Sequence, residues 1–211
     1  MTTTVDTMGL ARDERADLVA LLRLLTPQQW QAGTLCEQWR VRDVVAHVFS
    51  YEDLGAVGLV GRFLGGGLRP DHVNARSVAA FDDHDPEQLL TRARERLRPR
   101  GLTAAFGGRI ALTDALIHHQ DIRRPLGLTR AIPAERLLTA LDFAKTARPI
   151  GAAKRIRGLT LIATDHDWRH GTGPEVHGPA ESLIMAMAGR HSVVGELDGP
   201  GVPTLATRMP A

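Results

Sequence analysis

The chain has 211 residues, of which 43% are hydrophobic and 4% aromatic, and its formal net charge is +2. These values are typical of a globular protein with one good core, or with one core and a small appendage. No apolar run is long enough to span a bilayer, and residues Met1 to Met8 lack the apolar segment of a signal peptide. The single cysteine, Cys36, excludes an intrachain disulfide. It fits a reducing compartment, so we expect a cytoplasmic protein without a membrane partner.

The densest run of positive charge lies between Arg92 and Arg100, where every second residue is an arginine. Glu87 and Glu95 lie in or just before the same segment, and no aromatic residue alternates with the arginines. A nucleic-acid surface would be expected to combine basic and aromatic side chains. We therefore interpret this run as a solvated helix face and expect no nucleic-acid partner.

Helical periodicity and capping residues predict a series of helices before residue 150. A helix that begins at Asp85-Pro86 has an N-cap aspartate and a proline at its first helical position. The predicted helices cover about Leu10–Leu25, Val41–Leu64, Asp71–Asp82, Asp85–Leu97, Gly108–Pro125 and Pro133–Ala147.

The pattern changes after Gly151. Residues Leu159–Thr164 form a β-type run, and Glu175–His177 predict a second short strand that would complete a hairpin. A short helix is expected over Pro179–Ala188. The sequence thus predicts a helical domain over residues 1–150 and a small α+β module over residues 151–211.

The most informative stretch is the predicted helix from Ile110 to Asp121. Ile110, Asp114, Ile117 and Asp121 share one helical stripe, so two carboxylates lie where apolar residues are expected. A buried carboxylate needs a charged partner, hydrogen bonds or a metal ion. His118 lies one turn after Asp114, and such a pair can hold one side of a divalent metal. The alternative is an Asp–His hydrogen bond in a polar core.

Other candidate sites carry weaker signals. Cys36 precedes the second long helix, whose dipole could lower the pKa of a catalytic thiol, although a buried small residue is the simpler interpretation. No serine lies in a nucleophile motif. His47 flanks an apolar helix face, where a histidine is more often structural. A possible metal cluster on the predicted hairpin consists of His166, His170 and His177 with Asp165 and Asp167.

Several motifs together resemble a known family. The segment Trp39-Arg-Val-Arg-Asp-Val-Val-Ala-His47 resembles the signature of the DinB-like superfamily, in its mycothiol-dependent maleylpyruvate isomerase branch. Asp114-x-x-x-His118-x-x-Asp121 is similar to the acid-x-x-x-His-x-x-Asp of that family on a later helix. Segments 161–168, 173–180 and 188–190 resemble the C-terminal module of the same branch. The motifs occur in the expected order over about residues 10 to 205.

This resemblance implies a mainly α fold, a DinB-like four-helix bundle with a small C-terminal α+β module. It also implies a divalent metal, with zinc expected, held by His47, Asp114 and His118. Asp121 would be an outer partner of a ligand histidine or would pair with a nearby arginine. Three protein ligands leave a coordination position open, as catalytic sites do.

The family further implies mycothiol, a low-molecular-weight thiol, as co-substrate. Its metal-held thiolate would add to a small electrophilic molecule, and the outcome would be isomerisation or S-transfer. The protein is expected to be a monomer or a homodimer. One departure concerns Asp114, because the isomerase is expected to carry Glu there. Aspartate is one methylene shorter, so either the helix lies closer to the metal or the site is weaker.

Two other function classes stay open. One is a metal-dependent hydrolase that uses bound water, and the other is a non-catalytic binding or stress-response protein.

His119 follows directly after His118, and one residue of helix turns the side chain by roughly 100°. We therefore expect His119 to face another element or solvent, away from the ligands of the proposed ion.

Overall fold

The computed structural model describes residues 5–51 and 78–209. Its contacts divide the chain into two compact units, Met1–Thr129 and Arg130–Ala211, and each is described by itself. The division falls before the helix Ala134–Ala144. The sequence predicts a domain boundary at residue 150, which would place this helix in the first domain. It belongs to the second unit because it packs against Ala180–Met187 of that unit.

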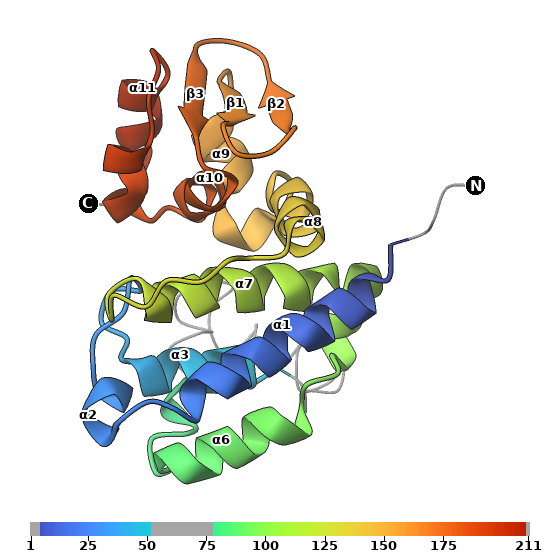
Figure 1. Cartoon of the computed structure of the whole chain (residues 1–211), viewed down its shortest axis with the longest axis vertical. Helices are drawn as coiled ribbons and strands as arrows, with labels where there is room; N and C mark the ends of the chain where they lie inside the picture. Colours follow the sequence, from blue (N-terminus) through green and yellow to red (C-terminus); the bar gives the residue numbers. More distant parts are fainter. Residues whose placement is uncertain (1–4, 52–77, 210–211) are drawn as a thin grey trace. The chain divides into compact units, whose positions relative to one another are not determined.

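The first unit contains the expected helical bundle. Helix α1 (Thr7–Leu22) packs against α7 (Arg109–Arg123) and α6 (Pro86–Glu95). Helix α3 (Val41–Val48) packs against the same two helices, so each of these four has two neighbours among them (Figure 1). The 3₁₀ segment η1 leads directly into α7. The elements of this unit are α1 (Thr7–Leu22), α2 (Pro27–Trp30), α3 (Val41–Val48), α6 (Pro86–Glu95), η1 (Gly101–Gly108) and α7 (Arg109–Arg123).

Local capping chemistry explains where the helices begin. The Asp85 side chain accepts a hydrogen bond from the Gln88 backbone N–H at 2.8 Å, and the Gln88 side chain accepts one from Asp85 N–H at 2.8 Å. This reciprocal pair confirms the predicted start of α6. Helix α1 begins earlier than expected because Asp6 caps it, accepting from Gly9 N–H at 2.9 Å.

Two sequence predictions fall mainly outside the described residues. Helix α3 is described to Val48, and the predicted continuation to about Leu64 lies largely within residues 52–77. Most of the predicted helix over Asp71–Asp82 lies there as well.

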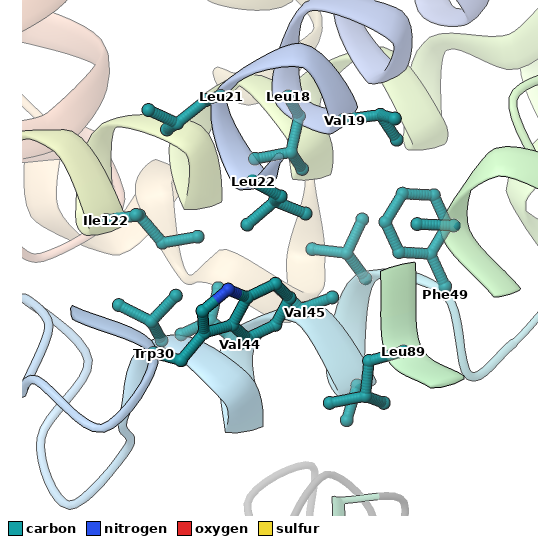
Figure 2. Close-up of a cluster of buried hydrophobic side chains, with 14 of the residues drawn as sticks. Leu18, Val19, Leu21, Leu22, Trp30, Val44, Val45, Phe49, Leu89 and Ile122 are labelled. Atoms are coloured by element: carbon teal, nitrogen blue, oxygen red, sulfur yellow. The ribbon is translucent and has the colours of Figure 1, made fainter. Parts of the chain in front are cut away.

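The core of the first unit lies between α1, α3, α6 and α7, as Figure 2 shows. Every one of the four contributes apolar side chains that are at most 1% exposed, among them Leu18 and Leu22 of α1, Val44 and Val45 of α3, Leu89 of α6 and Ile122 of α7. Burying one such side chain contributes about 1.5–3 kcal/mol. This core fixes the positions of α3 and α7, the two helices that carry the candidate ligands.

The second unit combines short helices with a three-stranded sheet (Figure 1). Helix α10 (Ala180–Met187) packs against α8 (Ala134–Ala144), α9 (Ala152–Ile156) and strand β1 (Thr160–Ala163). Its elements are α8 (Ala134–Ala144), η2 (Arg148–Ile150), α9 (Ala152–Ile156), β1 (Thr160–Ala163), β2 (Arg169–Gly171), β3 (Glu175–Gly178), α10 (Ala180–Met187), η3 (His191–Glu196) and α11 (Val202–Ala206). In the described parts of both units, no helix is both long enough and apolar enough to cross a bilayer.

The predicted hairpin of β1 with β3 is wrong. Strand β1 is central, β2 pairs with it antiparallel, and β3 pairs with its other edge in parallel. The sequence interpretation missed β2, which is short and polar. The chain reverses a second time at Gly173 (φ 131°), where a Cβ atom would lie 2.1 Å from Gly158 O. Only glycine fits this close approach, which carries the chain past β1 to its free edge.

Candidate metal centre

Helix α3 presents His47 in its last turn. At the other end of the helix, Asp43 accepts from Arg40 N–H and from Arg40 Nε, both at 2.9 Å, which holds the first turn in place. Arg42 Nη2 lies within hydrogen-bond distance of the carbonyl oxygens of Phe81, Asp82 and His84. The helix that carries His47 is thus tied to the segment before α6.

The structure brings His47 together with Asp114 and His118 of α7. The distance from His47 Nε2 to Asp114 Oδ1 is 3.5 Å, and from His118 Nε2 to the same oxygen it is 3.6 Å. The centroids of the two imidazole rings lie 4.9 Å apart. One donor atom from each residue lies within 4.8 Å of the others. Their role as metal ligands stays a prediction, but the three residues predicted from the sequence do share one site.

The spacing of these atoms fits a metal better than hydrogen bonding. Hydrogen bonds of this kind are about 2.7–3.2 Å long, so both separations exceed that range. Two ligand atoms at about 2.0–2.1 Å from a tetrahedral zinc ion lie about 3.3–3.4 Å apart, close to the separations at Asp114. Two imidazoles and one carboxylate are also donors that zinc prefers. The Asp114 side chain is 30% exposed, which leaves the group accessible to a small molecule.

A second layer of contacts holds His118. Its Nδ1 lies 2.9 Å from Asp121 Oδ2, and the Asp121 side chain is fully buried. A carboxylate beside Nδ1 favours the tautomer with hydrogen on that nitrogen, which leaves Nε2 to bind a metal. The contact expected between Asp121 and a candidate ligand histidine is therefore present, and it orients His118 toward Asp114 and His47. The role of Asp121 in support of a metal ligand stays a prediction.

Cys36 belongs to this second layer. Its Sγ donates to Asp121 Oδ2 at 3.1 Å and lies 3.6 Å from His118 Nδ1. Cys36, His118 and Asp121 are also close enough to form a ligand group. However, 2.9 and 3.1 Å are hydrogen-bond distances, shorter than the spacing of ligands around an ion, so we assign these contacts to support of His118. This contact could not be predicted from local sequence patterns, because Cys36 and Asp121 are 85 residues apart.

Aromatic rings flank the two histidines. The Trp39 ring lies 5.0 Å from that of His47 and 6.4 Å from that of His118, measured between centroids. Tyr51 meets His47 edge-on at 5.7 Å. These rings keep water away from part of each imidazole, which strengthens electrostatic interactions within the group.

Electrostatics in the group favours opposite charges. Burial raises the pKa of Asp114, but His118, His47 and Arg15 outweigh it, so that the net pKa lies below its ordinary value. Burial lowers the pKa of His118, but Cys36, Asp114 and Asp121 outweigh it and hold that pKa well above 6.5. Without a metal, the site is therefore set to keep a carboxylate beside an imidazolium.

This pairing predicts a pH dependence. A metal must displace the His118 proton, so zinc affinity should rise by about tenfold per pH unit until the pH passes the raised pKa. The folding stability of the metal-free protein should instead fall as the pH rises. The stabilisation that follows from the raised pKa of His118 is fully present below pH 6.5 and is lost as the pH rises through the folded-state pKa. Zinc titrations and thermal midpoints between about pH 6 and 9, with and without chelator, test both trends. A zinc affinity independent of pH in this range would contradict the assignment.

The histidines of the second unit do not converge. His166 lies 3.0 Å from Asp165, His177 lies 3.0 Å from Glu175, and the His170 ring packs near Trp168. Within the described ranges, neither group with ligand spacing includes any of them. The possible metal cluster on the predicted hairpin is therefore wrong, since the strands do not form that hairpin.

His119 faces away from the candidate ligands, as predicted. Its Nδ1 lies 2.9 Å from Glu14 Oε1 of α1.

Comparison with known proteins agrees with the helical fold and with the family resemblance of the sequence motifs. Residues 11–98 match the family model of the mycothiol maleylpyruvate isomerase N-terminal domain. The fold is similar to crystal structures of the mycothiol-dependent maleylpyruvate isomerase and of a variant with one histidine replaced by alanine. Each is 17% identical, with a TM-score of 0.61, and the match covers 92% of this chain and 91% of the other. This likeness confirms the predicted fold. No curated protein sequence matches the chain.

Proposed function

We propose that the protein is a metal- and thiol-dependent enzyme, a proposal supported by the match of residues 11–98 to the family model of the mycothiol maleylpyruvate isomerase N-terminal domain. Its proposed substrates are mycothiol, or a thiol of the same class, and a small electrophile. The observation that carries this proposal is the group of His47, Asp114 and His118, whose donor atoms have the spacing of metal ligands.

In this proposal His47, Asp114 and His118 hold a divalent ion, and zinc fits these donors best. When bound, such an ion supplies Lewis acidity that lowers the pKa of a thiol, so that the thiolate is available near neutral pH. Asp121 keeps His118 in the tautomer that offers Nε2. Trp39 and Tyr51 shield the imidazoles from water, and the exposed edge of Asp114 leaves access for substrates.

The proposed reaction is a reversible thiol addition. The thiolate sulfur forms a bond to one carbon of an electrophilic double bond, and the π electrons move onto the conjugated carbonyl group. Rotation about the resulting single bond and departure of the same thiolate give the geometric isomer, with no net oxidation. If a proton instead adds to the neighbouring carbon, the thiol stays attached and the product is a thioether.

Turnover that depends on both thiol and metal is the expected result. Zinc-loaded protein should convert maleylpyruvate to its trans isomer with mycothiol present, and should do so neither without thiol nor after chelation. The His118→Ala variant, which lacks a proposed ligand, is the matched control. Product analysis by chromatography decides between the classes. A hydrolase would consume a susceptible ester or amide without thiol, and a binding protein would turn over neither substrate.

A further inference from the structure

A buried polar bridge joins α1 to α7 one residue beyond the candidate ligand His118. Glu14 Oε1 and His119 Nδ1 lie 2.9 Å apart, and both side chains are fully buried. Arg123 Nε donates to His119 Nε2 at 2.9 Å. The three side chains thus form a continuous chain of hydrogen bonds between two helices.

The arginine fixes the state of His119. Arginine nitrogens always carry their hydrogens, so His119 Nε2 must accept from Arg123. The remaining ring hydrogen then lies on Nδ1 and is donated to Glu14. Every polar atom of the imidazole has a defined role, so the bridge has one favourable arrangement.

The surfaces beside the bridge contain small residues. On α7, three of the fully buried side chains are Ala111, Ala115 and His119, which lie at helical spacing on one face. On α1, the corresponding fully buried residues are Ala11, Glu14 and Leu18. Alanines allow two helices to approach closely, but they offer few features that select one rotation of a helix about its axis. A directional hydrogen-bonded pair does select one, as buried polar groups do in other helical assemblies.

We propose that the Glu14–His119–Arg123 bridge sets the rotation of α7 and thereby directs Asp114 and His118 toward His47. This inference rests on the proposed function, because it treats those three residues as metal ligands. A rotation of about 15° would displace an atom about 6 Å from the helix axis by about 1.6 Å. Metal–ligand distances tolerate deviations of only about 0.2 Å, so a small rotation is enough to damage the site.

The test replaces the bridge with apolar residues of similar size. In the Glu14→Leu/His119→Leu variant, packing is retained and the buried carboxylate and imidazole are removed together. Arg123 loses its acceptor on His119, but it is only half-buried and keeps its contact with Thr129 O, so the thermal midpoint should stay close to that of the wild type. Zinc affinity should fall by at least about tenfold. The visible absorption of bound Co²⁺, which reports coordination geometry, should weaken and shift. Glu14→Gln keeps an acceptor for His119 Nδ1–H and should restore both readouts to nearly wild-type values.

Leu18→Ala is the matched control. It removes buried volume from the same face of α1 without touching the bridge, so it should lower the thermal midpoint but leave the Co²⁺ spectrum unchanged. A double variant with wild-type zinc affinity and Co²⁺ spectrum would overturn the proposal. If the double variant does not fold, Glu14→Leu alone is measured in the same way and judged by the same criterion.

A metal-free readout separates this proposal from the proposed function. If the wild-type protein binds neither zinc nor Co²⁺, the proposed function fails. The crystal structure of the metal-free bridge variant then still decides the positioning role. A changed distance from His47 Nε2 to Asp114 Oδ1 would support that role, whereas an unchanged separation of 3.5 Å would refute it.

Discussion

Replacing His118 with alanine is expected to lower zinc affinity by at least about a thousandfold, which corresponds to about 4 kcal/mol. The variant keeps only His47 and Asp114 as proposed ligands. It also removes one of the partners of Asp121, whose side chain is fully buried and accepts from His118 at 2.9 Å. Loss of that hydrogen bond should cost about 1–3 kcal/mol of folding stability. Zinc content after purification and competition with a chromophoric chelator measure the first effect, and chemical denaturation of metal-free protein measures the second.

His119→Ala is the informative comparison, because the two histidines are adjacent and both are buried. This variant keeps all three proposed ligands and loses the two contacts of His119, with Glu14 and with Arg123. Its zinc affinity should fall far less than that of His118→Ala, by about tenfold if the bridge positions α7. The opposite order, with zinc lost in His119→Ala and retained in His118→Ala, would show that the wrong histidine was assigned to the metal.

Replacing Asp114 with asparagine should weaken zinc binding by at least about tenfold, or about 1.4 kcal/mol. Asparagine keeps the volume of the side chain but removes the charge, and a neutral amide oxygen is a poorer zinc ligand. If Asp114 were only a structural partner of the histidines, the amide would preserve much of the hydrogen bonding and metal content would not change. Zinc analysis of the purified variant separates these cases, and full occupancy would end the ligand hypothesis for this residue.

Asp114→Glu tests whether the site has adapted to the shorter acid. Asp114 Oδ1 already lies 3.5 and 3.6 Å from the two imidazoles, and the flanking Ala111 and Ala115 are fully buried. An added methylene should overpack this space and lower stability by about 1–3 kcal/mol, with weaker zinc binding. The measurements are zinc affinity and thermal midpoint beside those of Asp114→Asn. Tighter zinc binding at unchanged stability would instead mean that the site still accommodates glutamate.

The features that the sequence alone determined depend on residues within a turn or two of one another. The Asp85-Pro86 start of α6 follows from capping chemistry, and the stripe of Asp114, His118 and Asp121 follows from the helical repeat. A family resemblance added His47, which neither spacing nor composition had favoured. These signals were sufficient for the helical class and for the three residues that meet at the candidate metal centre.

Only the tertiary structure decided which distant residues support that centre. Glu14 and His119 are 105 residues apart, and Cys36 and Asp121 are 85 apart. No periodicity links positions so far apart, because their contact depends on how α1, α7 and the loop before α3 pack. The same holds for β3, whose parallel pairing with β1 depends on a second reversal of the chain at Gly173. Helix formation is decided mainly by local interactions, whereas these contacts exist only after the core has brought the elements together.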